Sequence, residues 1–228
     1  MEFSGLSERV HQARGSIAER QKAGGWAHPV TLIAVTKGHG PEAVQAAVEA
    51  GLRDIGENKV QEATAKQNAT SEVAARWHLI GSLQKNKARH ATGRFSLIHS
   101  VDREDLGAEL ARRSAPGSIQ PILVQVNCSN EPQKGGVDPE RLPALLDQLS
   151  VMLSLEVRGF MTMAALSADE GEQRRTFALL RQLRDTAVAA GHPGHELSMG
   201  MSSDYLIAVE EGATMVRLGT LLFGERSR

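Results

Sequence analysis

Two hydrophobic patterns alternate along this chain. Short apolar runs of the kind that form buried strands are followed by segments whose apolar residues recur at helical spacing. The first run, TLIAVTK at 31–37, lies between Pro29 and Gly38, and the segment after it begins with proline and ends with glycine, as helices do. The pattern predicts further strands at 52–58, 76–82, 95–102, 120–129, 154–163, 195–201 and 213–224.

Eight predicted strands, each followed by a helical segment or, for the last, by the terminus, indicate an α/β fold of the (β/α)8 TIM-barrel type. An open doubly wound sheet is the alternative. That fold normally has a glycine-rich turn after its first strand, where this chain has only KGHGPE. Because no low-complexity linker interrupts the pattern, we expect residues 1–228 to form a single barrel domain.

Two helix ends are also predicted. An extra helix before the barrel, at about residues 4–23, would end at Gly24-Gly25, and its buried side would carry Leu6, Val10, Ala13 and Ile17. After the sixth strand, Ser167 and Glu170 have the spacing of a capping box, which predicts a helix start there.

Composition and charge narrow the function classes. A hydrophobic content of 41% is typical of a globular protein. Because the formal net charge is only −1, no overall electrostatic field attracts nucleic acid or an anionic membrane. The basic stretch 83–94 is therefore interpreted as a solvated helix face. No apolar stretch approaches the roughly 20 residues that span a bilayer, and the N-terminal residues lack the apolar core of a secretory signal.

Cysteine and histidine patterns exclude the common metal sites. The single cysteine, Cys128, allows no internal disulfide and no cysteine-based zinc site, and the eight histidines match no metal motif. We expect a cytoplasmic monomer without metal, nucleic-acid or membrane partners.

Lys37, at the end of the first predicted strand, raises the question of function. An ammonium is costly to desolvate unless it is paired or neutral. Either Lys37 lies just past the strand and points into water, or its amine is kept for chemistry. Other polar residues recur at the same relative position, where barrel enzymes collect their chemistry, including Asn58, His78, Asn127 and Ser202.

Two segments suggest a phosphate site. In GMSSD, Ser202 and Ser203 would place hydroxyls beside backbone N–H groups at a helix start, and Gly219 would let a ligand approach the chain after the eighth strand. These are the customary phosphate loops of a barrel. Taken alone, Ser202 could equally be a helix cap and Gly219 a bend; together with Lys37 they favour a phosphate.

Arg217 completes the pattern. It alternates with Val216 and Leu218, so it shares a face with Gly219 and points into the barrel if Gly219 lines the mouth. A buried guanidinium needs a polar partner. Glu57 or Asp102 could supply a salt bridge, or a ligand could supply a ring nitrogen.

A lysine amine, a phosphate site and an inward arginine together suit pyridoxal 5′-phosphate. Its aldehyde condenses with a neutral lysine, and desolvation favours the neutral amine. An arginine at the pyridine nitrogen leaves that nitrogen unprotonated and weakens the ring as an electron sink, which disfavours aminotransferase-type chemistry.

The motifs resemble those of the pyridoxal phosphate homeostasis protein family. The resemblance runs in order from residue 31 to residue 224 through AVTK, GENKVQEA, WHLIGSLQKNK, VQVN, RGFMTM, LSMGMSSDY and VRLGTLLFG. Ser82 replaces a common proline and Cys128 a usual aliphatic residue, and neither touches the expected anchors.

The resemblance implies a barrel like the N-terminal domain of alanine racemase and a role for each anchor. Lys37 would carry the cofactor as a Schiff base, and Arg217 would face the pyridine nitrogen. Ser202, Gly219 and Thr220 would hold the phosphate. The residues expected around the ring are Asn58, His78 and Met199.

The resemblance also implies a protein that buffers the cofactor or delivers it to apo-enzymes, with no catalytic residues. The alternative is a pyridoxal phosphate-dependent amino-acid racemase. Racemisation in the related fold needs a second base, a tyrosine from another domain. The single tyrosine of this chain is Tyr205, three residues after Ser202, and we therefore favour the carrier.

Overall fold

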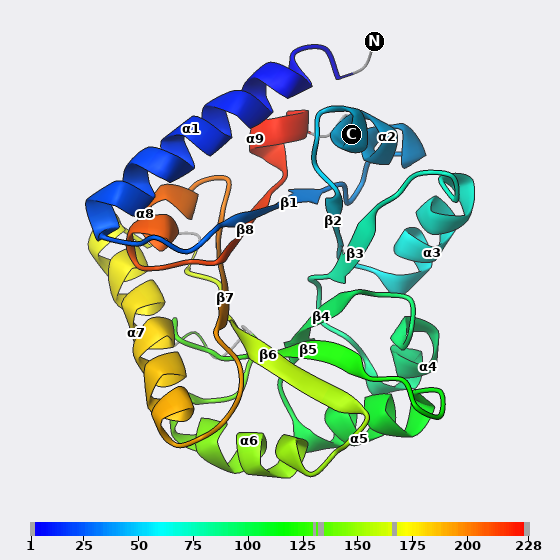
Figure 1. Ribbon diagram of the computed structural model, residues 1–228, viewed down its shortest axis with the longest axis vertical. Helices are drawn as coiled ribbons and strands as arrows, with labels where there is room; N and C mark the ends of the chain where they lie inside the picture. The colour runs from blue at the N-terminus through cyan, green and yellow to red at the C-terminus, as the bar shows by residue number, and fades with distance from the viewer. Residues whose placement is uncertain (1–2, 130, 132–134, 166–167, 226–228) are drawn as a thin grey trace.

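Parallel strands closed into a ring form the centre of the molecule. In the computed structural model, which describes residues 3–129, 131, 135–165 and 168–225, eight strands pair in sequence order and the last pairs with the first (Figure 1). The predicted barrel is therefore confirmed. The strands are β1 (Thr31–Val35), β2 (Asp54–Glu57), β3 (Arg76–Leu79), β4 (Leu97–Val101), β5 (Gln120–Gln125), β6 (Leu155–Met161), β7 (Glu196–Met201) and β8 (Met215–Leu218).

Helices surround the barrel and alternate with the strands (Figure 1). The chain was expected to finish on the eighth strand, but a short helix, α9, follows it. The helices after β1 are α2 (Pro41–Glu49), α3 (Val60–Ala69), α4 (Ala88–Ala91), α5 (Glu104–Arg113), α6 (Leu142–Ser150), α7 (Glu170–Ala189), α8 (Tyr205–Glu210) and α9 (Thr220–Phe223). Short 3-10 turns, η1 (Lys85–Lys87) and η2 (Pro139–Arg141), precede α4 and α6.

The extra N-terminal helix is present as α1 (Leu6–Gly24) and contacts α8 and α9 on the outside of the ring (Figure 1). Its C-cap is Gly25, whose φ of 75° is the left-handed conformation that glycine tolerates. Its buried side is the predicted one, made by Leu6, Val10, Ala13 and Ile17.

The start of α7 differs from the expected capping box. The helix begins at Glu170, and its N-cap is Asp169, whose side chain accepts a hydrogen bond from the Glu172 N–H at 2.8 Å. The Asp169 N–H in turn donates to Glu172 Oε2 at 3.2 Å. Ser167 lies outside the described residues. The capping box therefore lies two residues later than predicted, and Glu172, not Glu170, is its acidic partner.

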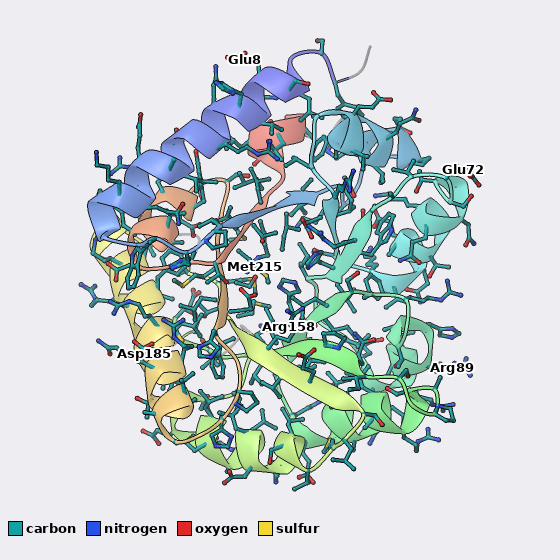
Figure 2. All side chains as sticks on the ribbon, in the orientation of Figure 1. Glu8, Glu72, Arg89, Arg158, Asp185 and Met215 are labelled. Atoms are coloured by element: carbon teal, nitrogen blue, oxygen red, sulfur yellow. The ribbon has the colours of Figure 1, made fainter. Side chains whose placement is uncertain are left out.

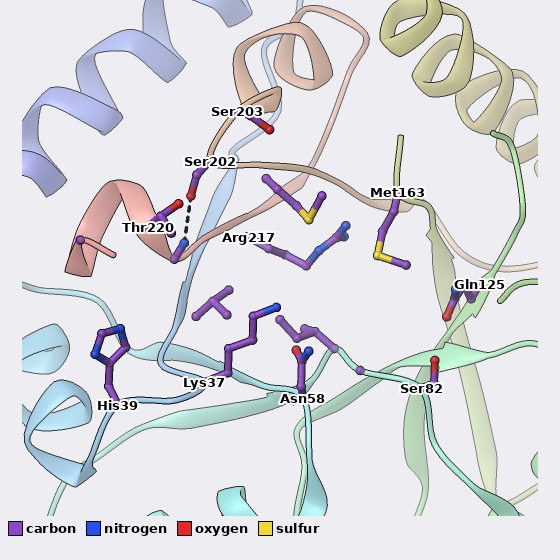
Figure 3. A pocket seen from close by; sticks show the side chains of 16 residues that line it. Lys37, His39, Asn58, Ser82, Gln125, Met163, Ser202, Ser203, Arg217 and Thr220 are labelled. Atoms are coloured by element: carbon purple, nitrogen blue, oxygen red, sulfur yellow. Dashed lines mark hydrogen bonds between the residues drawn. The ribbon is translucent and has the colours of Figure 1, made fainter. Parts of the chain in front are cut away.

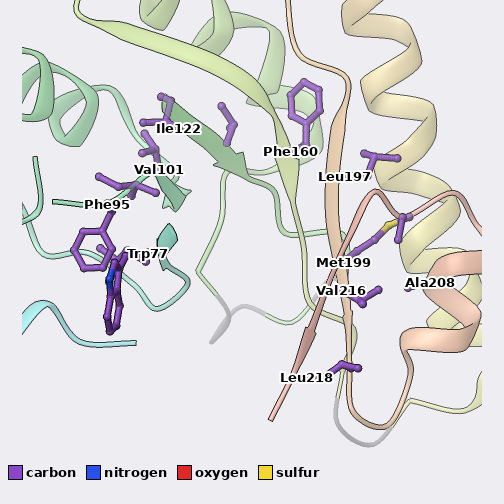
Figure 4. Packing of buried hydrophobic residues seen from close by; sticks show 14 of the residues in the cluster. Trp77, Phe95, Val101, Ile122, Phe160, Leu197, Met199, Ala208, Val216 and Leu218 are labelled. Carbon is purple, nitrogen blue, oxygen red and sulfur yellow. The ribbon is translucent and has the colours of Figure 1, made fainter. Parts of the chain in front are cut away.

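Strand alternation divides the apolar residues into two groups. A small cluster fills the barrel interior, made by Ile33, Leu97, Leu123, Met161 and Met215. The larger core lies between strands and helices, where Phe160, Leu197, Met199, Val216 and Leu218 pack (Figure 4). Charged side chains such as Glu8, Glu72, Arg89 and Asp185 extend from the rim into solvent (Figure 2).

Among the described residues, none of the helices combines the length and the apolar character that a bilayer crossing requires.

Candidate functional site

A cavity of about 390 Å³ opens at the carboxyl ends of the strands. Six of the eight predicted site residues line it: Lys37, Asn58, Ser202, Arg217, Gly219 and Thr220. They come from the ends of β1, β2, β7 and β8, so barrel closure brings together positions that are up to 183 residues apart, from 37 to 220.

Lys37 points into this cavity (Figure 3). The residue follows β1 by two positions, on the turn that leads to α2, and its side chain extends toward Asn58 and Arg217. Of the two alternatives open from the sequence, the structure has the lysine facing the cavity and half-buried there.

Two side chains of α3, Lys66 and Glu62, hold the backbone of both neighbours of Lys37. Lys66 Nζ donates to the Thr36 carbonyl oxygen at 2.7 Å, and the Gly38 N–H donates to Glu62 Oε1 at 2.6 Å. Lys66 also bridges Glu57 Oε1 at 2.6 Å, and Thr36 Oγ1 donates to the same oxygen at 2.5 Å. These contacts fix the backbone on each side of Lys37.

Sequence reasoning missed Lys66 and Glu62. The available signal was the spacing of Val60, Ala63 and Lys66, which places a lysine on the apolar side of α3, where all three are buried. A lysine on such a side needs a buried carboxylate nearby.

Glu57 was one of two carboxylates considered as a partner for Arg217, and this is not its role. It lies outside the barrel wall and pairs with Lys66, while Asp102 pairs with Arg103 at 2.6 Å. Burial raises the pKa of the Glu57 carboxyl, and the hydrogen bonds from Lys66 and Thr36 counteract only part of that rise.

Arg217 is 4% exposed and points into the barrel interior. Its Nη1 donates to the Ser198 carbonyl oxygen at 2.8 Å and to Ser198 Oγ at 2.6 Å, and its Nη2 donates to the Thr162 carbonyl oxygen at 2.9 Å. Burial lowers the pKa of the guanidinium to about 10, against the opposing charge of Asp204. Arg217 therefore remains a cation at neutral pH.

The loops after β7 and β8 are joined through Ser202. Its Oγ accepts hydrogen bonds from the Gly219 N–H at 3.2 Å and the Leu221 N–H at 3.3 Å (Figure 3). Ser203 and Thr220 also line the cavity here. Three hydroxyls thus gather on one wall, across the cavity from Lys37.

His78 and Met199 are not among the residues that line the cavity, which corrects their predicted position. Met199 follows inward-facing Ser198 on β7, so the two-residue alternation turns it outward into the helix-covered core (Figure 4). His78 does face inward, but one layer deeper, with Ile80 above it at the cavity. The cavity also contains residues that the site prediction omitted, such as Gln125, Met163 and Met201.

In the part of the chain that the structure describes, His, Cys, Asp and Glu side chains form no group of three or more that could hold a metal ion. Burial raises the pKa of the Cys128 thiol to about 12, so this thiol is not a nucleophile at neutral pH.

The family model of the alanine racemase N-terminal domain matches residues 19–227. Curated relatives carry the name pyridoxal phosphate homeostasis protein. The relative from Aquifex aeolicus is 40% identical, with 98% of this chain and 96% of the relative covered. The one from Pseudomonas aeruginosa is 40% identical, with 98% and 97% covered, and the one from Escherichia coli K12 is 36% identical, with 97% of each covered.

Solved structures agree in fold. PipY of Synechococcus elongatus PCC7942, with PLP bound, has a TM-score of 0.85 at 39% identity, and the alignment covers 96% of this chain and 100% of that one. An alanine racemase of Clostridium difficile has a TM-score of 0.75 at 13% identity over 93% of this chain and 59% of the racemase, a likeness of fold alone.

Proposed function

This chain belongs to the pyridoxal phosphate homeostasis protein family, and from that premise we propose that it binds pyridoxal 5′-phosphate in the cavity at the carboxyl ends of its strands. It holds the cofactor as a Schiff base on Lys37 and buffers the cofactor or delivers it to apo-enzymes. The observation that carries this proposal is that Lys37, the hydroxyls of Ser202 and Thr220, and the guanidinium of Arg217 face one cavity.

The residues present fit the chemistry of this cofactor. When bound, the cofactor supplies an aldehyde that condenses with a primary amine and releases one water. Lys37 supplies the amine, which must lose its proton before it can attack, and it lies half-buried in the cavity. PipY, 39% identical and named as binding PLP, supports the assignment.

The other roles follow from the donors at each wall. Ser202, Ser203 and Thr220 offer hydroxyl donors to a phosphate, and Gly219 leaves room beside them. Arg217 and Asn58 line the same cavity, where Arg217 would donate to the ring nitrogen and Asn58 would lie at the side of the ring. Because a guanidinium donates and stays charged, it keeps that nitrogen unprotonated.

The carrier is favoured over an amino-acid racemase. A racemase requires a base on each face of the bound ring. Tyr205 is 8% exposed, packs in the outer core, and is not among the residues lining the cavity. The two functions are separated by incubation with L-alanine in deuterium oxide: sustained Cα exchange and D-alanine formation, lost in Lys37→Ala, would contradict the carrier.

The direct test is covalent labelling. The protein incubated with pyridoxal 5′-phosphate is expected to turn yellow, and borohydride reduction followed by peptide mass mapping is expected to find the label on Lys37. Lys37→Ala is expected to lose both colour and label. Label on Lys59 or Lys85 in place of Lys37 would contradict the site.

A further inference from the structure

A line of buried polar side chains crosses the interior of the barrel below the cavity. From Arg217 Nη1 it passes to Ser198 Oγ at 2.6 Å, and from there to His99 Nδ1 at 2.9 Å. His99 Nε2 lies 3.0 Å from His78 Nδ1, and His78 Nε2 lies 3.0 Å from Asp54 Oδ1. Each of these side chains is at least nine-tenths buried.

The far end of the line reaches the opposite mouth of the barrel. Asp54 and Arg76 begin β2 and β3, form a two-point ion pair at 2.7 and 2.5 Å, and line a second cavity of about 450 Å³ beside α1. Burial raises the pKa of the Asp54 carboxyl, but the hydrogen bonds from Arg76 and His78 and the charge of Arg76 outweigh it and lower the pKa to about 2. Asp54 is therefore an anion at neutral pH.

The hydrogen bonds have one consistent direction when both histidines are neutral. An ionised carboxylate only accepts, so the proton of His78 is on Nε2 and its Nδ1 is bare. That Nδ1 accepts from His99 Nε2–H, which leaves His99 Nδ1 to accept from the Ser198 hydroxyl. The Ser198 oxygen in turn accepts from Arg217. Each group then donates once toward Asp54, and aligned bonds of this kind strengthen one another.

Burial explains why His99 stays neutral. Arg217 lies at one end of the line and Arg76 at the other, with Asp204 and Asp54 as their carboxylates. Burial, together with the neighbouring charge of Arg217, lowers the pKa of His99 well below its ordinary 6.5. A second proton, on His99 Nδ1, would remove the acceptor of the Ser198 hydroxyl and place another cation near Arg217.

We propose that Ser198, His99 and His78 are positioning residues that hold the Arg217 guanidinium against the ligand, with Asp54 at the other end of the barrel as the acceptor that sets the direction of the line. The inference rests on the proposed function, in which Arg217 faces the ring nitrogen. Three of the five N–H bonds of Arg217 are committed to Ser198 and Thr162, and this directs the remainder toward the cavity.

The first test uses the protein without ligand. Nitrogen-15 NMR of histidine-labelled protein at pH 7 is expected to show His78 and His99 neutral, each with its proton on Nε2. A proton on Nδ1 of either ring, or a doubly protonated His78, would overturn the directed line. This result does not depend on whether pyridoxal 5′-phosphate binds.

The second test measures ligand binding. Ser198→Ala and His99→Leu are expected to weaken pyridoxal 5′-phosphate binding about tenfold and to shift the absorbance band of the bound cofactor, because Arg217 loses a charge-assisted hydrogen bond or its support. His99→Gln, which can still accept and donate, is expected to restore most of the affinity. His11→Gln, on the exposed side of α1, is the matched control and is expected to bind like the parent.

The outcomes separate the two proposals. If the cofactor labels Lys37 but Ser198→Ala and His99→Leu bind it with parental affinity and band position, the positioning role is wrong and the proposed function stands. If His99→Leu does not fold, Ser198→Ala decides, since it removes one oxygen from a small side chain. A loss of binding in Asp54→Asn, far from the cavity, would support the line along its whole length, and parental binding by that variant would exclude Asp54 from it.

Discussion

At the scale of single residues, position within the two-residue repeat of a strand decides function. Ser198 and Met199 are neighbours on β7, yet one contacts Arg217 inside the barrel and the other packs in the outer core. Arg217 and Val216 divide in the same way on β8. A one-residue change of register would therefore exchange a site residue for a packing residue.

Gly159 gives a prediction at this scale. It lies in β6 with φ of 152°, and a Cβ there would lie 2.0 Å from the Glu196 carbonyl oxygen on β7. Backbone cannot move aside cheaply, so Gly159→Ala is expected to lower the free energy of unfolding by about 2–4 kcal/mol. Urea titration followed by circular dichroism measures it.

The matched control is Gly15→Ala in the middle of α1, where an added Cβ meets nothing within 4 Å. Helix propensity predicts a gain of about 0.5–1 kcal/mol there. Equal effects from the two substitutions would contradict the steric explanation.

At the scale of elements, helix α3 holds the turn that presents Lys37. Lys66 and Glu62 contact the residues on either side of it, and Glu57 on β2 ties Lys66 to the barrel wall. The strand ends that form a barrel mouth would otherwise be loosely tethered loops. Through the Lys66–Glu57 ion pair, helix α3 determines the position of Lys37 on its turn.

Lys66→Met tests this arrangement. It leaves Glu57 buried without its cation, and we expect a loss of about 3–5 kcal/mol in the free energy of unfolding. Adding Glu57→Gln removes the unpaired charge, so the double variant is expected to recover part of that loss. Additive losses in a double-mutant cycle measured by urea unfolding would show that the two side chains are not coupled.

At the scale of the whole molecule, closure of the barrel buries groups that would titrate in an open chain. His99 is fully enclosed by strands from both halves of the sequence, with Ser198 on one side and His78 on the other.

That the chain is a monomer of one domain stays a prediction.

Burial of His99 makes stability depend on pH. Because its pKa is lowered in the folded state, the unfolded chain takes up a proton near pH 6.5 that the folded chain refuses. Stability from this residue is therefore complete above about pH 6.5 and declines as pH falls below it. Urea titrations between pH 8 and pH 5 are expected to show this decline, and His99→Gln to flatten it. An equal slope in the variant would assign the decline to other groups.

The order and spacing of the apolar runs were enough to predict the barrel and most of its mouth. Eight apolar runs at regular spacing left few ways to bury them, and the carboxyl ends of parallel strands must meet, so Lys37, Asn58, Ser202, Arg217, Gly219 and Thr220 could be expected together. These inferences need only the order and period of the residues along the chain.

Depth and side-chain pairing were decided only by the tertiary structure. The sequence could not show that His78 lies a layer below the cavity, that Met199 faces outward, or that Lys66 pairs with Glu57. The line from Arg217 to Asp54 joins residues from five strands and was equally hidden. Such contacts depend on the register between neighbouring strands and on which polar groups lose contact with water when the barrel closes. The residue pattern of a single segment contains neither kind of information.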